Sequence, residues 1–368
     1  MEAAKIFLIN PTNIEIYISF AFIFVLVLKA ARFFSSLFSK KYIDLHCHLD
    51  GSITIEIAKK LAALQHMEKK SDKELEQLLY VPEQCQSLNQ FLNCFGYPLS
   101  LMQTKEGLSE SVKLVSDNIQ SQGVIYAELR FAPQLHTSKM TQEDAIKAAL
   151  DGIKKTTLKV NLILCFMRGE DNDDKNLETL RLARKYLVED NGVVAVDLAG
   201  AEALFPTSKY KDLFDKCKQY GIPYTIHAGE ADGAESVRKA IEFGAKRIGH
   251  GTRAFEDSRV VQLIKEKGIF LEMCPTSNLQ TKALKDMTKF PFMDYLNNGI
   301  NVTLNTDDMA IERTTLPKEF EYMEKNFGLN SKQEKKILMN SINAAFTTDD
   351  VKRELRKKIN FSCFNFLC

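Results

Sequence analysis

The sequence lacks paired cysteine motifs, blocks of one charge and low-complexity tracts. Its eight cysteines are scattered without any CxxC pair, and a chain of 368 residues needs no disulfide staples. A reducing compartment is therefore expected. Lys and Arg number 49 against 48 Asp and Glu, which gives a net charge of +1. No basic block stands out, and this argues against nucleic acid as a partner.

A glycine-rich phosphate-binding turn is also missing after every predicted strand. A hydrophobic content of 45% over 368 residues allows one large domain or two small ones. From Tyr42 onward, short apolar runs alternate with amphipathic segments. Eight such units predict a (β/α)8 barrel, that is, a TIM barrel of the α/β class. A doubly wound open sheet is the alternative, and the missing phosphate turn disfavours it.

The predicted elements follow from the period of the apolar residues. Extra helices are expected after the first strand, near 54–65 and 71–79, and at the C-terminus, at 331–345 and 349–358. The predicted strands cover residues 42–48, 124–133, 160–167, 193–200, 223–230, 247–251, 269–274 and 301–305.

Residues 1–41 differ from the rest of the chain. They contain an uncharged apolar run, Ile16–Leu28, which is shorter than the roughly 20 residues that a membrane-spanning helix needs. Extended to residues 14–34, it becomes a marginal membrane tether. Basic residues follow the run, so a tether would leave the main domain in the cytoplasm. A cleaved signal peptide fits less well, because it would need a basic region before the run, where Glu2, Lys5 and Glu15 stand, and an A-x-A-like site at its end.

Three segments are therefore expected. Residues 1–41 form a hydrophobic N-terminal segment, for which a membrane anchor and a gene-model extension both stay open. Residues 42–359 form the barrel domain. Residues 360–368 form an apolar C-terminal tail.

The stretch from Tyr42 to Gly51 reads YIDLHCHLDG and begins as a strand. Side chains two residues apart on a strand point to the same face, so His46 and His48 can turn their rings toward one ion. Neutral imidazole is a common ligand for zinc and its neighbours. Alone, this pair is a weak signal, because two histidines at a strand end are also explained by ordinary hydrogen bonds.

Four other predicted strands end in residues suited to catalysis. In a barrel these ends meet at the face where barrel enzymes place their active sites. Core histidines, or aspartates that cap the next helix, would explain each end singly, but not five together. Together with the end of the first strand, which carries His46 and His48, these ends hold four of the six histidines. The four segments are Asp197–Gly200, His227–Glu230, Gly249–Gly251 and Thr306–Asp308.

The donors at these ends predict one metal site. Three nitrogens and one carboxylate suit a catalytic Zn²⁺ that keeps a position open for water, whose pKa it would lower toward 7. Glu230 lies three residues past His227 and could donate and accept a proton. His250 could hold the attacking hydroxide or stabilise developing charge. The proposed ligands are His46, His48, His227 and Asp307.

In this order and spacing, the segments HCHLDG, DLAG, IHAGE, RIGHG, CPTSN and LNTDD resemble the adenosine deaminase family of metal-dependent amidohydrolases. The likeness covers about Tyr42 to Ile359. It implies a (β/α)8 barrel with one zinc ion per chain. The implied reaction converts adenosine to inosine and ammonia, by attack of a zinc-bound hydroxide on purine C6, with 2′-deoxyadenosine as a further expected substrate.

The resemblance also implies roles for single residues. Glu230 matches the residue that protonates purine N1, and His250 matches the histidine beside the hydroxide. The zinc ligands match His46, His48, His227 and Asp307. The residues expected to contact the substrate are His48, Asp50 (ribose), Gly200 (purine N3) and Asp308 (purine N7).

Several alternatives stay open within and beyond this resemblance. Adenine, AMP and N6-methyl-AMP deaminases share the zinc site, but a carboxylate at Asp50 favours a ribose hydroxyl and would repel a phosphate. A two-metal amidohydrolase would need a lysine at the end of the fourth strand, where none occurs. Zinc deaminases with a PCxxC ligand pair are excluded, because no such pair exists.

A nucleoside-binding or membrane-tethered signalling protein that has lost catalysis is the alternative from another class. It would be expected to lose Glu230 or a ligand, and none is missing. The expected partner is a small-molecule purine nucleoside, and the sequence gives no indication of the oligomeric state.

Overall fold

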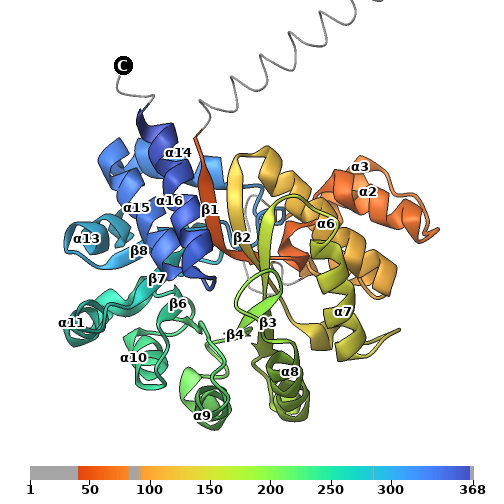
Figure 1. Cartoon of the computed structure of the whole chain (residues 1–368), viewed down its shortest axis with the longest axis horizontal. Coiled ribbons are helices and arrows are strands. Elements are labelled where there is room, and N and C mark those ends of the chain that lie inside the picture. Colours follow the sequence, from red (N-terminus) through yellow and green to blue (C-terminus); the bar gives the residue numbers. More distant parts are fainter. Residues whose placement is uncertain (1–39, 83–90, 92, 285, 365–368) are drawn as a thin grey trace, which may run out of the picture.

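The computed structural model describes residues 40–82, 91, 93–284 and 286–364. Within these residues, eight parallel strands pair in chain order around a barrel (Figure 1), as predicted. The pairing runs β1-β2-β3-β4 and β5-β6-β7-β8. The strands are β1 (Tyr42–His48), β2 (Val124–Phe131), β3 (Lys159–Met167), β4 (Val193–Ala199), β5 (His227–Ala228), β6 (Arg247–His250), β7 (Phe270–Met273) and β8 (Asn301–Leu304).

Two short bridges join these four-stranded sheets into a closed barrel. Between β1 and β8, His48 N donates to Asp307 O at 2.9 Å, and Asp307 N donates to His46 O at 2.8 Å. Between β4 and β5, Thr225 N donates to Val196 O at 3.1 Å. The strand β5 is therefore much shorter than the predicted 223–230, because the residues before His227 pair with β4 only at this bridge.

Helices surround the barrel, with the predicted additions after β1 and at the C-terminus (Figure 1). After β1 come α2 (Ile55–Leu64), α3 (Asp72–Leu79), α5 (Gly96–Leu101) and α6 (Lys105–Ser121). Between later strands lie α7 (Gln142–Ile153), α8 (Asp173–Tyr186), α9 (Lys211–Gln219), α10 (Ala234–Glu242), α11 (Ser258–Lys267), α12 (Pro275–Gln280) and α13 (Phe292–Asn297). After β8 follow α14 (Leu316–Phe327), α15 (Ser331–Ala344) and α16 (Asp349–Phe364).

Local sequence explains where several of these helices begin. Ser71, Thr141 and Asn330 each form a capping box with the residue three positions later. The box satisfies backbone N–H groups that have no partner inside the helix. The short helices α5 and α12 were not expected. α12 begins at Pro275, a residue type favoured in a first turn but also read as a turn signal.

A cluster of buried charges crosses the barrel interior. We call it the buried ion network and define it as Glu128, Arg130, Asp197, Arg247 and Glu272, all of which are at most 1% exposed. Arg130 donates to Asp197 Oδ2 at 2.9 Å and to Glu272 Oε2 at 2.8 Å. Arg247 pairs with Glu128 and Glu272. Each of these buried charges therefore has at least one opposite charge beside it.

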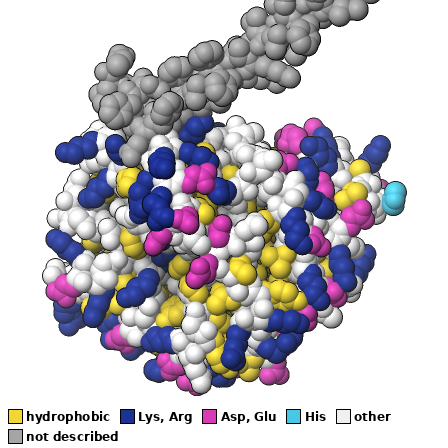
Figure 2. All heavy atoms as spheres, in the orientation of Figure 1, with side chains coloured by type: hydrophobic (Ala, Val, Ile, Leu, Met, Phe, Trp, Pro, Cys, Tyr) yellow, Lys and Arg dark blue, Asp and Glu magenta, His cyan; other side chains and the backbone are white. Residues whose placement is uncertain are grey.

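The outer surface carries charges of both signs. On the face shown in Figure 2, lysine and arginine side chains are interspersed with aspartate and glutamate. Among the described residues, no helix combines the length and the apolar composition that crossing a bilayer requires. The proposed tether at residues 14–34 lies outside the described residues.

Candidate active site

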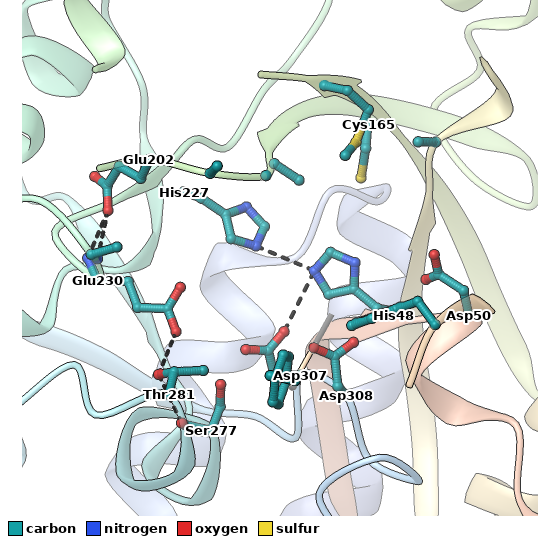
Figure 3. A pocket seen from close by; sticks show the side chains of 18 of the residues that line it. His48, Asp50, Cys165, Glu202, His227, Glu230, Ser277, Thr281, Asp307 and Asp308 are labelled. Atoms are coloured by element: carbon teal, nitrogen blue, oxygen red, sulfur yellow. Dashed lines mark hydrogen bonds and ion pairs between the residues drawn. The ribbon is translucent and has the colours of Figure 1, made fainter. Parts of the chain in front are cut away.

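The C-terminal ends of the strands surround a cavity of about 340 Å³ (Figure 3). Of the nine residues predicted for the site, every one except His46 lines this cavity, and His46 lies against it with no exposed surface. The structure therefore brings together all the residues that the sequence singled out. The eight lining residues are His48, Asp50, Gly200, His227, Glu230, His250, Asp307 and Asp308.

Four donor atoms converge at the base of the cavity. The side-chain ligand atoms of His46, His48, His227 and Asp307 all lie within 4.8 Å of one another. His48 Nε2 lies 3.2 Å from His227 Nε2 and 3.4 Å from Asp307 Oδ1 (Figure 3). His46 Nε2 lies 3.3 Å from the same oxygen. Such spacing is suited to a single ion at the centre.

Carboxylates of the buried ion network orient two of these histidines. His46 Nδ1 lies 2.8 Å from Glu272 Oε2, and His227 Nδ1 lies 2.8 Å from Asp197 Oδ2. A carboxylate beside Nδ1 holds the proton there and leaves Nε2 free to bind a metal. Burial by itself would raise the pKa of Glu272, but the charges of Arg247 and Arg130 bring it well below its usual value.

The donor set fits a zinc ion. Three imidazole nitrogens and one carboxylate oxygen match the ligands that zinc takes in catalytic sites. His46 Nε2 is buried and has no hydrogen-bond partner among the described residues, which is unfavourable unless a cation binds it. His48 Nε2 and His227 Nε2 lie 3.2 Å apart, so both nitrogens are close enough to bind the same ion.

Unusual backbone conformations present these side chains. His250 and Asp307 have φ angles of 63° and 67°, in the left-handed region that non-glycine residues rarely adopt. Two glycines make room beside them. A Cβ at Gly249 would lie 2.9 Å from His46 Cε1, and a Cβ at Gly51 would lie 1.9 Å from Asp308 Oδ1. The glycines of the HCHLDG and RIGHG segments thus have a steric explanation.

Glu230 points into the cavity from the loop after β5 (Figure 3). Its Oε1 accepts a hydrogen bond from Thr281 Oγ1 at 3.0 Å, and its Oε2 lies 3.5 Å from His250 Nε2. Burial, and secondly the nearby Asp307 carboxylate, raises the pKa of Glu230 to about 8. At neutral pH this side chain therefore carries a proton that it can donate.

His250 is held in one tautomer by its neighbour on α12. Asn278 Nδ2 lies 3.1 Å from His250 Nδ1, and Asn278 Oδ1 accepts from Thr252 Oγ1 at 2.6 Å. Because the Asn278 amide nitrogen is a donor, His250 Nδ1 accepts and the imidazole proton resides on Nε2. That N–H group faces the cavity, 3.6 Å from Asp307 Oδ2.

Two further acids line the cavity without a cation beside them. Burial raises the pKa of Asp50 to about 6, and its Oδ1 has no hydrogen-bond partner among the described residues. Burial and the adjacent Asp307 raise the pKa of Asp308 well above its ordinary value. Backbone N–H groups of Asp50 and Gly51 act against this rise, as they would for a carboxylate that caps the 3-10 turn which begins at Asp50.

The sequence did not indicate the residues that contact the site residues through hydrogen bonds and ion pairs. A charged residue in the middle of an apolar strand was the available signal, as in YAELRF for Arg130 and FLEM for Glu272. The same signal marks Asp197 in VVAVDLA, whereas no such signal marks the remaining residues, which lie in the loop after β4, on α12 or at its C-terminal end. The missed residues are Arg130, Asp197 as a partner of His227, Glu202, Glu272, Asn278 and Thr281.

Comparisons with known proteins agree with one another. The family model described as adenosine deaminase matches residues 42–361. The adenosine deaminase of Haemophilus ducreyi is 47% identical over 324 residues, which is 85% of this chain and 94% of the relative. An adenosine deaminase of Clostridium botulinum is 41% identical over 323 residues, which is 86% of this chain and 97% of the relative.

Solved structures show the same fold. The adenine deaminase of Arthrobacter aurescens superposes with a TM-score of 0.76 at 24% identity, covering 88% of this chain and 98% of that protein. The N6-methyl-AMP deaminase of Arabidopsis thaliana also superposes with a TM-score of 0.76. Its sequence is 25% identical, and the match covers 89% of this chain and 98% of that protein.

Proposed function

The chain belongs to the adenosine deaminase family and is a hydrolase that deaminates adenosine, and from this premise we propose which groups carry out the reaction. One zinc ion and a neutral purine nucleoside bind in the described cavity. The convergence of four ligand atoms within 4.8 Å, beside a protonated Glu230, supports this proposal above all other observations.

The nitrogens of three histidines and one carboxylate would hold the metal. Zinc there would lower the pKa of a bound water toward 7 and so supply a nucleophile at neutral pH. The buried ion network keeps His46 and His227 in the tautomer that binds a cation. The ligands are His46, His48, His227 and Asp307.

Glu230 and His250 act on the reacting atoms. Glu230 in its neutral form donates its proton to purine N1, which makes C6 more electrophilic. Thr281 and His250 fix the direction of the Glu230 carboxyl group. The Nε2–H group of His250 orients the attacking oxygen and stabilises the charge that builds up on it. Asp308 and the Gly200 backbone contact the purine.

The charges of the cavity favour a nucleoside over a nucleotide. Among the described residues, the lining contains no lysine or arginine to bind a phosphate, and Asp50 adds a negative charge. Much of the remaining wall is apolar, including Phe95, Leu99 and Leu135. A nucleotide is the second candidate, because the chain also resembles an N6-methyl-AMP deaminase. Repulsion from Asp50 would amount to several kcal/mol at a few ångströms, for an effective dielectric constant of about 20.

Metal analysis tests the first part of the proposal. The purified protein should contain about one zinc ion per chain. His227→Ala should lose most of it, whereas the exposed His66, changed to Asn, serves as the control and should keep it. Two metal ions per chain, or a full metal complement in His227→Ala, would contradict the ligand assignment.

A substrate panel tests the second part. At pH 8 Asp50 is ionised, and kcat/KM should be far higher for adenosine than for adenine or AMP. In Asp50→Asn, the value for adenosine should fall while that for AMP holds or rises, because the repulsion is removed. An equal loss for all three substrates would show that Asp50 acts only in the structure of the cavity.

The domain organisation belongs to the same proposal. Residues 42–359 form the deaminase domain, residues 1–41 precede it and residues 360–368 follow it, although α16 continues across the second boundary to Phe364. A membrane tether at residues 14–34 would hold this domain at the cytoplasmic side, with the basic residues after the run facing the cytoplasm. Intact-mass spectrometry decides whether residues 1–41 are present, and fractionation of the full chain then tests the tether.

A further inference from the structure

The carboxylate of Glu202 is almost completely buried beside the cavity and makes an unusual set of contacts. Glu202 lies in the loop after β4, is 3% exposed, and accepts hydrogen bonds from four consecutive backbone N–H groups. Figure 3 shows its carboxylate directed at the backbone beside Glu230. Its Oε1 accepts from Gly229 N at 2.7 Å. Its Oε2 accepts from the N–H groups of Glu230, Ala231 and Asp232 at 3.1, 2.8 and 3.0 Å.

A hydroxyl group adds a fifth donor to this carboxylate. Ser236 Oγ, on α10, donates to Glu202 Oε1 at 2.5 Å and lies 2.6 Å from Thr207 Oγ1. Arg168 Nη2 donates both to Thr207 Oγ1 at 3.0 Å and to His227 O at 2.6 Å. Glu202 is thereby fixed on both sides, and its oxygens are directed at backbone groups of the loop.

The loop that Glu202 holds has no regular structure of its own. Residues 229–232 form bends between β5 and α10, and Gly229 has a φ angle of 76°. Four successive N–H groups that converge on one point form a concave site for an anion. Without an acceptor these groups would lose their hydrogen bonds, and the loop would have other conformations available to it.

From these contacts we infer that Glu202 is a positioning residue for Glu230. By fixing the backbone on both sides of Glu230, the Glu202 carboxylate determines where the proton-donating carboxyl group lies in the cavity. This inference rests on the proposed role of Glu230. Proton transfer by Glu230 would then depend on Glu202, which lies in the loop after β4 and accepts hydrogen bonds from five donors.

The isosteric change Glu202→Gln tests the inference. It replaces one acceptor oxygen by an NH2 group that faces N–H donors, with almost no change in volume. Amide hydrogen exchange at residues 229–232 should become at least tenfold faster, and kcat for adenosine should fall about 10- to 100-fold with KM changed less than threefold. Zinc content should stay unchanged, because Glu202 contacts no ligand side chain.

A double-mutant cycle distinguishes positioning of Glu230 from a general structural role. In a Glu230→Gln background, adding Glu202→Gln should lower the remaining rate less than threefold, because the group that it positions is already disabled. Asp190→Asn is the control. This carboxylate accepts from Asn161 and Thr347, away from the cavity, and its removal should leave kcat unchanged.

Three results would overturn the inference: an equal loss of rate in both backgrounds, loss of zinc in Glu202→Gln, or unchanged exchange at residues 229–232. The exchange measurement does not depend on activity. If the unaltered protein failed to deaminate adenosine, the proposed function would be wrong, while the exchange result would still decide whether Glu202 holds the loop.

Discussion

Two groups of buried carboxyl groups lie within one barrel and differ in their neighbours. In the buried ion network, Asp197 and Glu272 are paired with Arg130, and their pKa values lie below the ordinary range in spite of burial. Around the cavity, the acids Asp50, Glu230 and Asp308 have no arginine or lysine partner among the described residues.

The pKa values of these cavity acids are all raised. Burial acts in the same direction on both groups, because it disfavours the charged form of a carboxyl group. Partners that favour the charged form therefore decide which of these buried carboxyl groups have a lowered pKa: Arg247 and Arg130 for Glu272, and His227 and Arg130 for Asp197. These two carboxylates orient histidines, whereas Glu230, whose pKa is raised, can donate a proton.

Removing the proton donor should have the largest effect. Glu230→Gln keeps the shape of the side chain but cannot donate an acidic proton to purine N1. We expect kcat to fall by about 10²- to 10⁴-fold, which corresponds to roughly 3–5 kcal/mol of activation free energy. Zinc content should stay at one per chain. A variant with near-normal kcat would show that another residue is the donor.

Disrupting the buried ion network should mainly lower the free energy of unfolding. Arg130→Met leaves Asp197 and Glu272 without the cation that they share, and the loss of one partner from a buried pair costs about 3–5 kcal/mol. Urea unfolding should show this loss, together with weaker retention of zinc. The control is Arg238→Met, whose ion pairs on α10 are exposed and should be dispensable. Equal stability of the two variants would contradict the importance of the network.

Removing one neutral hydrogen bond from the cavity acids should have the smallest effect. Thr281→Val deletes the hydroxyl that donates to Glu230 Oε1. A hydrogen bond of this kind contributes about 1 kcal/mol, so we expect kcat to fall about fivefold without loss of zinc. Thr137→Val removes a similar hydroxyl outside the cavity and should leave kcat unchanged. A loss as large as that of Glu230→Gln would mean that Thr281 itself takes part in proton transfer.

Much of the fold was predictable because its signals are local. Each of the eight predicted strands is present, and the prediction failed mainly in extent, as at β5, where pairing with β4 is limited to one bridge. The site residues were predictable for a related reason. They lie at the C-terminal ends of strands or in the residues that follow, and the C-terminal ends of parallel barrel strands meet at one face.

The sequence by itself determined which donors could share a face, such as His46 and His48 on β1, because side chains alternate along a strand. The tertiary structure decided which groups are partners across long separations. Arg130 and Glu272 lie 142 positions apart, and Glu202 lies 27 positions from Gly229. Spacing along the chain fixes geometry over only a few residues. Contacts over longer separations, and the charge states that depend on them, were set when the barrel closed and excluded water from these groups.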